Sequence, residues 1–106
     1  MLMTKDERIT KKLCVNELRN IGLNFRLIDS YSHITEVLAY ATTREELFDM
    51  VESESIKRGI EKCDVITQEW CADKNMYSKN YYHTKERTMF IYEDGKQKFV
   101  QIRQNY

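Results

Sequence analysis

The sequence predicts an α+β fold with an N-terminal amphipathic helix, a middle helical region and a small antiparallel sheet that includes a C-terminal β-hairpin. Three observations carry this prediction. Apolar residues recur at helical spacing behind a capping box at Thr4, an Asp-Gly pair separates two β-type runs near the C-terminus, and proline is absent. Because the chain also has only three glycines, few breaks are forced on it and long regular elements are favoured.

The length of 106 residues and the composition predict one globular domain over residues 1–106. Hydrophobic residues make up 42% of the chain and charged residues 32%. This balance is typical of a folded domain with a well-solvated surface rather than of a disordered chain.

Residues 5–21 are predicted to form the first helix. Thr4 followed three residues later by Glu7 matches a capping box, and Gly22 is placed as a C-terminal stop. The apolar residues that share one face of this helix are Leu13, Cys14, Leu18 and Ile21.

Residues 23–29 alternate between apolar and polar side chains and are predicted to form a half-buried strand. The next segment fits two structures. Its apolar residues at helical spacing are Ile34, Val37, Leu38 and Ala41. This spacing favours a helix capped by Ser32, although the same residues also fit a short strand running into Thr43.

Thr43 and Glu46 form a second capping box, which predicts another helix. Leu47, Met50 and Val51 give this helix an apolar stripe, but Ile56 and Ile60 lie roughly opposite to it. The helix is therefore expected to bend near residues 53–55 or to be covered on two sides. Between residues 63 and 80 the pattern is poor, and Trp70 is the expected anchor.

The C-terminal third contains the clearest signal. Residues 88–92 and 97–103 are β-type runs on either side of Asp94-Gly95, a pair favoured in two-residue hairpin turns. The expected cross-strand pairs are Glu93 with Lys96, Phe90 with Phe99, and Met89 with Val100. This register places four aliphatic residues on one face of the hairpin, namely Met89, Ile91, Val100 and Ile102.

The charge of the chain is balanced overall but segregated along its length. Formal net charge is zero, so the chain as a whole is not the strongly basic domain expected of an electrostatic nucleic-acid binder. Residues 1–35 carry six basic and four acidic side chains, residues 36–73 carry four and ten, and residues 74–106 carry seven and three. The three segments therefore sum to +2, −6 and +4.

Patterns for metal binding, cofactor binding and catalysis are weak. The three cysteines and two histidines lack the paired spacing of zinc ligands, no glycine-rich phosphate loop is present, and no local nucleophile–base motif occurs. We therefore expect no metal, no cofactor and no enzymatic activity. The odd number of cysteines without C-x-x-C spacing and the absence of a leading apolar stretch predict reduced thiols and a cytoplasmic location, away from membranes.

The candidate binding residues lie in the last third of the sequence, where aromatic rings alternate with cations. They are Tyr81, Tyr82, Arg87, Phe90, Tyr92, Phe99 and Arg103. Tyrosine and arginine are enriched at the energetic centres of protein interfaces. Rings and cations together are also what single-stranded nucleic acid requires.

The sequence thus favours a small non-enzymatic binding or regulatory protein that acts through a protein–protein surface. Lys, Asn, Ile, Tyr, Phe and Met, which have A/T-rich codons, make up about two-fifths of the chain, which indicates an AT-rich genome such as that of a low-GC bacterium or one of its phages. Together with the absence of a catalytic pattern, this suggests a phage-type accessory or inhibitor protein. The alternative is a single-stranded RNA or DNA binding module that uses the tyrosine-rich, basic C-terminal hairpin.

Overall fold

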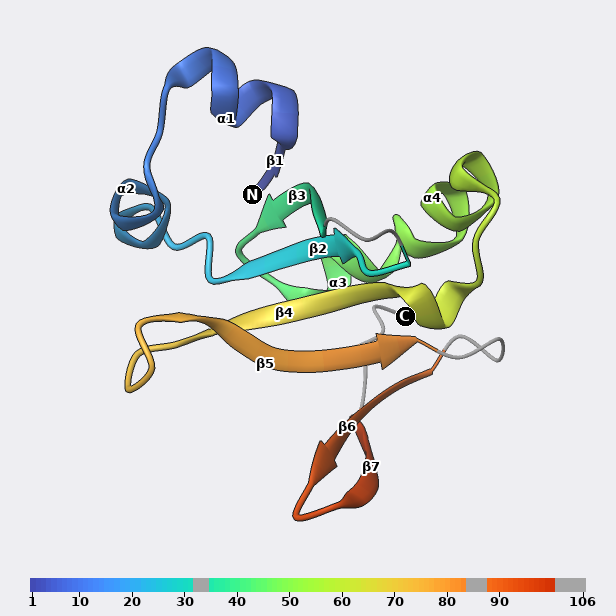
Figure 1. Cartoon of the computed structure of the whole chain (residues 1–106). Coiled ribbons are helices and arrows are strands. Elements are labelled where there is room, and N and C mark those ends of the chain that lie inside the picture. Colours follow the sequence, from blue (N-terminus) through green and yellow to red (C-terminus); the bar gives the residue numbers. More distant parts are fainter. Residues whose placement is uncertain (32–34, 84–87, 101–106) are drawn as a thin grey trace, which may run out of the picture.

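The computed structural model describes residues 1–31, 35–83 and 88–100, and its central feature is a seven-stranded antiparallel sheet (Figure 1). The strands are β1 (Leu2–Thr4), β2 (Phe25–Asp29), β3 (Glu36–Ala41), β4 (Val65–Cys71), β5 (Met76–His83), β6 (Met89–Glu93) and β7 (Lys96–Val100). Their order in the sheet is β1-β3-β2-β4-β5-β6-β7. The helices are α1 (Lys5–Lys11), α2 (Val15–Asn20), α3 (Arg44–Phe48), α4 (Val51–Arg58) and the 3₁₀ turn η1 (Lys62–Asp64).

The predicted fold class is wrong in its balance between helix and strand. The four α-helices are only five to eight residues long, whereas the sheet runs through the whole molecule. The expected small sheet beside substantial helices is therefore replaced by a large sheet with short helices against it. No helix in the described ranges is long and apolar enough to span a membrane.

The predicted helix over residues 5–21 is divided into α1 and α2. Thr4 is confirmed as the N-cap of α1, because the backbone N–H of Glu7 donates to Thr4 Oγ1 at 3.2 Å. Lys12, however, adopts a left-handed conformation with φ of 55°, and this conformation ends α1. The break changes the chain direction before α2, where Leu18 is fully buried, so two short helices replace one long one.

The helix favoured for residues 32–41 is also wrong. Glu36–Ala41 is strand β3, which lies between β1 and β2, while Ser32 and Ile34 lie outside the described residues. Four consecutive residues of β3, from Leu38 to Ala41, are buried. A strand covered on both faces has no polar alternation, and its apolar run fits helical spacing equally well.

Thr43 is confirmed as the N-cap of α3, where the backbone N–H of Glu46 donates to Thr43 Oγ1 at 3.4 Å. The helix ends at Phe48, and α4 begins at Val51, so the discontinuity comes earlier than the expected bend. Ile56 is 73% exposed. The helix is therefore not covered by other residues on the side that carries Ile56.

The segment without a clear pattern forms the longest strands, β4 and β5. They pair antiparallel across a turn in which Asn75 has a φ of 54°. The register shifts by one residue opposite Glu69 and Trp70, which leaves Ser78 as the extra residue of a β-bulge in β5. The bulge turns Tyr77 toward Trp70, with ring centroids 5.0 Å apart, and Trp70 is the anchor that was expected.

The C-terminal hairpin is confirmed in position and register. β6 pairs with β7 through Glu93 and Lys96, Phe90 and Phe99, and Met89 and Val100. The turn residues Asp94 and Gly95 have φ values of 52° and 76°, as a two-residue turn requires. Of the four residues expected on the aliphatic face, Met89 and Ile91 are buried, Val100 is partly buried, and Ile102 lies outside the described residues.

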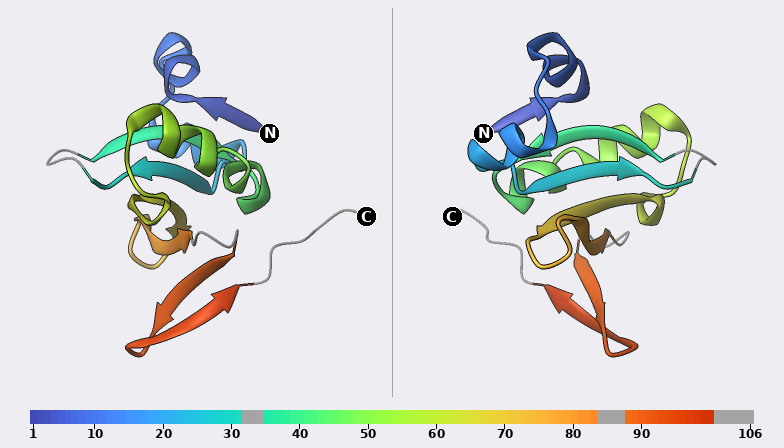
Figure 2. Two further views of the ribbon diagram at one scale, coloured as in Figure 1. Left: turned by 90° about the vertical axis from the view of Figure 1, so that its right-hand side faces the viewer. Right: turned by 60° about the vertical axis from the view of Figure 1, so that its left-hand side comes forward.

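Two packed layers hold the sheet. Helices α3 and α4 cover one face, where Leu47 and Val51 pack against strand residues that include Leu27 and Val65. Leu18 and its neighbours near α2 pack on the other face against Tyr40 and Tyr77. Figure 2 shows α1 at one end of the molecule and the β6–β7 hairpin at the opposite end. The base of the hairpin packs in a third cluster, in which Phe48 of α3 packs against a core that includes Met89 and Ile91, while the turn of the hairpin lies farthest from α1.

Candidate functional site

Four of the seven candidate residues come together on one face of the hairpin and the end of β5. The ring centroids of Tyr82 and Phe90 are 5.4 Å apart in a stacked arrangement, because Tyr82 pairs with Phe90 across the sheet. Tyr92 meets both rings edge-on, at 5.8 Å and 5.5 Å. Phe99 lies 6.3 Å from Phe90, its cross-strand partner. We call these four residues the aromatic face.

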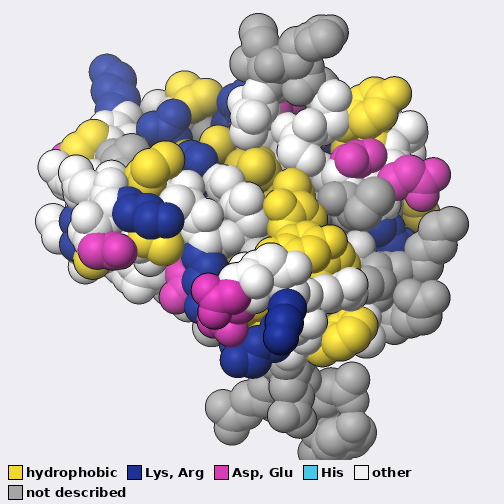
Figure 3. Space-filling view, turned by 60° about the horizontal axis from the view of Figure 1, so that its bottom comes forward, with side chains coloured by type: hydrophobic (Ala, Val, Ile, Leu, Met, Phe, Trp, Pro, Cys, Tyr) yellow, Lys and Arg dark blue, Asp and Glu magenta, His cyan; other side chains and the backbone are white. Residues whose placement is uncertain are grey.

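The aromatic face is accessible. Tyr92 is 59% exposed and Phe99 is 65% exposed, while Tyr82 and Phe90 are half-buried beneath them. Figure 3, in which the hairpin end of the molecule comes forward, shows hydrophobic side chains gathered among charged ones. Tyr92 and Phe99 therefore present ring surface that solvent can reach next to the partly covered rings of Tyr82 and Phe90.

The lysines of the hairpin point away from these rings. Side chains alternate across a strand, so Lys96 and Lys98 share the face of Met89 and Ile91, opposite to the aromatic face. Lys98 Nζ also pairs with Glu93 Oε2 at 3.1 Å. Within the hairpin, the alternation of rings and lysines in the sequence therefore places the two kinds of side chain on opposite faces.

Tyr81 does not belong to this face. It is 2% exposed, and its hydroxyl donates a hydrogen bond to Glu69. Burial, with the contribution of Glu69, raises the pKa of Tyr81 to about 12. Its ring lies 5.0 Å from the guanidinium carbon of Arg44, which makes it a packing residue beneath α3. The remaining candidates, Arg87 and Arg103, lie outside the described residues.

A groove adjoins the aromatic face because β5 and β6 diverge. The two strands pair only through Tyr82 with Phe90 and His83 with Met89. Beyond these pairs the hairpin swings away from β5 (Figure 1). The space between them, which we call the β5 groove, has a volume of about 390 Å³. Its lining includes Lys74, Ser78, Asn80, Tyr82, Tyr92 and Glu93.

Polar side chains connect this groove to the middle of the sheet. Arg26 Nε donates to Gln68 Oε1 at 2.7 Å, and Gln68 Nε2 donates to Asn80 Oδ1 at 2.9 Å. Sequence reasoning missed the groove, since no motif marked Ser78, Asn80 or the divergence of the strands. The sequence features nearest to it are the turn-forming residues Asp73 and Asn75 and the tyrosines at 77, 81 and 82.

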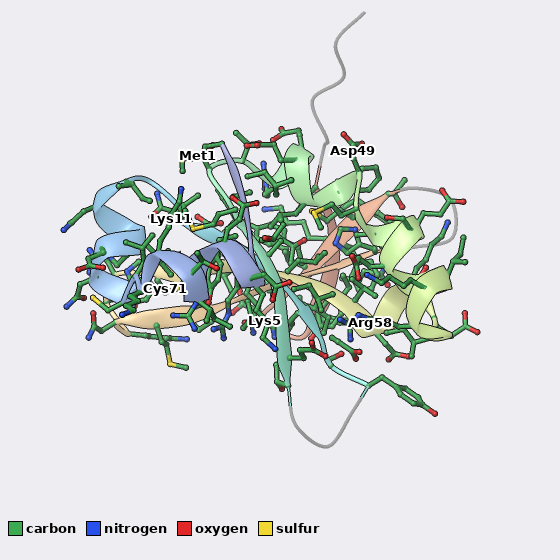
Figure 4. All side chains as sticks on the ribbon, turned by 90° about the horizontal axis from the view of Figure 1, so that it is seen from above. Met1, Lys5, Lys11, Asp49, Arg58 and Cys71 are labelled. Atoms are coloured by element: carbon green, nitrogen blue, oxygen red, sulfur yellow. The ribbon has the colours of Figure 1, made fainter. Side chains whose placement is uncertain are left out.

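A second cluster of charges lies at the other end of the molecule, and it is internally paired. Arg58 Nη1 lies 2.8 Å from Glu36 and 3.3 Å from Asp29, and Arg58 Nε lies 3.3 Å from Glu54. The hydrogen bond from Arg58 lowers the pKa of Glu36. Lys5 also reaches Glu36, at 3.5 Å, across a cavity of about 290 Å³. In Figure 4 Lys5 and Arg58 lie on the same side of the molecule. We interpret this cluster as a set of ion pairs that holds α4 against the sheet.

His83 is buried directly beside the point where the hairpin begins. Its Nε2 lies 3.0 Å from Thr67 Oγ1, and its ring lies 5.6 Å from that of Phe48. Burial lowers the pKa of His83 to about 4, so the imidazole is neutral at pH 7. Across the part of the chain that the structure describes, no group of three or more His, Cys, Asp or Glu residues is placed to hold a metal ion.

Comparisons of the chain with protein-family models, with curated proteins and with solved structures each found no match. The functional argument therefore rests on the geometry of the chain itself.

Proposed function

We propose that this protein is a non-enzymatic binding protein that recognises another protein through the aromatic face. The observation that carries the proposal is the cluster of four rings in mutual contact, two of them more than half exposed, on a hairpin that projects from the body of the fold. Clustered tyrosine and phenylalanine rings supply large contact area with little loss of side-chain entropy on binding. The residue usage of the sequence indicates an AT-rich genome, with which a phage-type accessory or inhibitor protein is compatible.

The distribution of charge supports a protein partner over a nucleic acid. Single-stranded nucleic acid is held by rings and cations that act on the same strand. Here Lys96 and Lys98 are on the opposite face of the hairpin from the rings. The acidic residues Glu93 and Asp94 adjoin these lysines at the turn. On the hairpin itself, a nucleic-acid partner would therefore meet rings on one face and lysines on the other, and the described cations beside the rings are Lys74 and Lys79 of the adjoining groove.

The test is a capture experiment with matched variants. The tagged full-length protein, Phe99→Ala and Lys98→Ala are each incubated with lysate of the native host, with and without nuclease. We expect a protein that is retained after nuclease treatment by the wild type and by Lys98→Ala, and that is lost with Phe99→Ala. Lys98 is the matched control because it neighbours Phe99 in the chain and points to the other face.

Two results would contradict the proposal. One is capture that Phe99→Ala leaves unchanged. The other is submicromolar binding to a single-stranded oligonucleotide that falls steeply with salt and weakens by about 1–3 kcal/mol in Tyr92→Ala, as expected if this ring stacks on a base. The second result would move the function to nucleic-acid binding at the same rings.

A further inference from the structure

We propose that the partner enters the β5 groove as an extended segment of polypeptide and adds a strand to the free edge of β5. This inference rests on the proposed function and specifies how the partner is held. It is carried by the divergence of β5 from β6, by the chemistry of the exposed edge, and by the position of the groove next to the aromatic face.

The edge of β5 is open over most of its length. On its β4 side the strand pairs from Met76 to Tyr81. On its other side β6 pairs only with Tyr82 and His83, and no other described strand pairs with the preceding six residues. Alternate residues of a strand direct their N–H and C=O groups to such an edge, where they form a ready template for another strand.

The groove has the size and lining that an extended peptide needs. Its volume of about 390 Å³ accommodates several side chains, and its walls are the β5 edge and the outer side of β6. Tyr82 and Tyr92 belong both to the groove and to the aromatic face, so the two surfaces are continuous. The Oγ atom of Ser78, which also lines the groove, is shielded from solvent and has no hydrogen-bond partner within the described structure.

The edge is better suited to a specific partner than to a second copy of this chain. The β-bulge at Ser78 bends the strand, and Lys79, an exposed residue whose Nζ lies 5.7 Å from the ring centroid of Tyr81, directly follows the bulge. Bulges and lysines are features that discourage edge-to-edge pairing of identical strands. Antiparallel pairing of two copies about this segment would also bring their Lys79 side chains close together. The occupant we propose is therefore a partner segment of about six residues, which spans about 20 Å when extended.

The experiment uses a displayed library of random twelve-residue linear peptides, panned against the full-length protein. An enriched peptide is then synthesised, and NMR is used to follow how it changes the hydrogen-exchange rates of the protein's backbone amides. We expect amides between Met76 and Tyr81 to slow by at least tenfold, because those that point to the free edge gain partners. Alternate amides of the bound peptide should point toward β5. N-methylation of this set should weaken binding at least tenfold, whereas N-methylation of the set that points away from β5 should have little effect.

The outcomes separate this inference from the proposed function. Peptides that shift the signals of Tyr92 and Phe99 but protect no β5 amide overturn the strand-addition inference and leave the proposed function in place. A selection that enriches no peptide, or binding that tolerates both methylated sets, also overturns it. Protection of the β5 edge in the free protein at high concentration, accompanied by a dimer in sedimentation, would assign the edge to a second copy instead. The proposed function is tested separately, by the capture and oligonucleotide-binding experiments described for it, and none of these outcomes at the β5 edge decides it.

Discussion

Acidification from pH 7 to pH 4.5 is predicted to destabilise the fold through His83. This side chain is 2% exposed, and burial lowers its pKa from 6.5 to about 4. In the unfolded chain His83 becomes protonated as the pH falls below about 6.5, whereas in the folded chain it stays neutral until about pH 4. Since the unfolded state binds the extra proton in this window, stability is lost as the pH falls.

The magnitude follows from the two pKa values. The difference between 6.5 and about 4 corresponds to about 3 kcal/mol of unfolding free energy, most of which is lost by pH 4.5. Such a loss is a large fraction of the stability of a domain of this size. Below about pH 4 the histidine contributes no further loss.

The assay is urea unfolding followed by Trp70 fluorescence at pH 7, 6, 5 and 4.5. His83→Gln is the control, because glutamine can hydrogen-bond to Thr67 but does not titrate. The wild type should lose about 2–3 kcal/mol more than His83→Gln over this range. Equal pH dependence in the two proteins would refute the reasoning, as would an NMR titration that gives His83 a pKa near 6.5 in the folded state.

Three further predictions follow from other parts of the structure. Gly95→Val should destabilise the protein by about 1–3 kcal/mol in urea unfolding, because the turn requires positive φ at this residue. Gly95→Asn should have little effect, since the space around the residue is open. Equal unfolding midpoints for wild type and Gly95→Val would place the turn elsewhere. Arg58→Met should cost about 2 kcal/mol of stability because it leaves buried Asp29 without its charge partner. Lys5→Met, at an exposed ion pair, should change stability by less than about 0.5 kcal/mol. Similar effects of the two substitutions would contradict the role of Arg58 in holding α4 against the sheet. Native mass spectrometry should find all three cysteines reduced and no bound zinc, and a stoichiometric metal adduct would contradict this prediction.

Local signals in the sequence predicted the structure well wherever the cause was local. The N-caps at Thr4 and Thr43 begin helices because a side-chain oxygen accepts a hydrogen bond from a backbone N–H three residues later. The hairpin register was predictable because Asp94 and Gly95 tolerate the left-handed conformations of the turn.

The errors arose where tertiary packing decides the structure. Strand β3 has both faces covered, which removes the alternation that would distinguish it from a helix. The break at Lys12 depends on a left-handed conformation in a residue that gives no sequence signal for it. In β5 the bulge at Ser78 places Tyr77 and Tyr81 on different faces, so that counting by twos along the strand fails.

The candidate site was predicted in part. Phe90, Tyr92 and Phe99 were expected to share a face, and they do. The two cations of the predicted site, Arg87 and Arg103, lie outside the described residues, and the lysines of the hairpin lie on the opposite face of the strands from the rings. Tyr81 is adjacent to Tyr82 in β5 and therefore lies on the opposite face of the strand, away from the aromatic face.

The measurement that tests the central claim most directly is the affinity of the captured, purified partner for wild type, Phe99→Ala and Lys98→Ala, by isothermal titration calorimetry. If the aromatic face is the contact surface, Phe99→Ala should weaken binding by about 2 kcal/mol, roughly thirtyfold, while Lys98→Ala stays within about twofold of wild type. Equal affinities of wild type and Phe99→Ala, with both variants folded, would contradict the account.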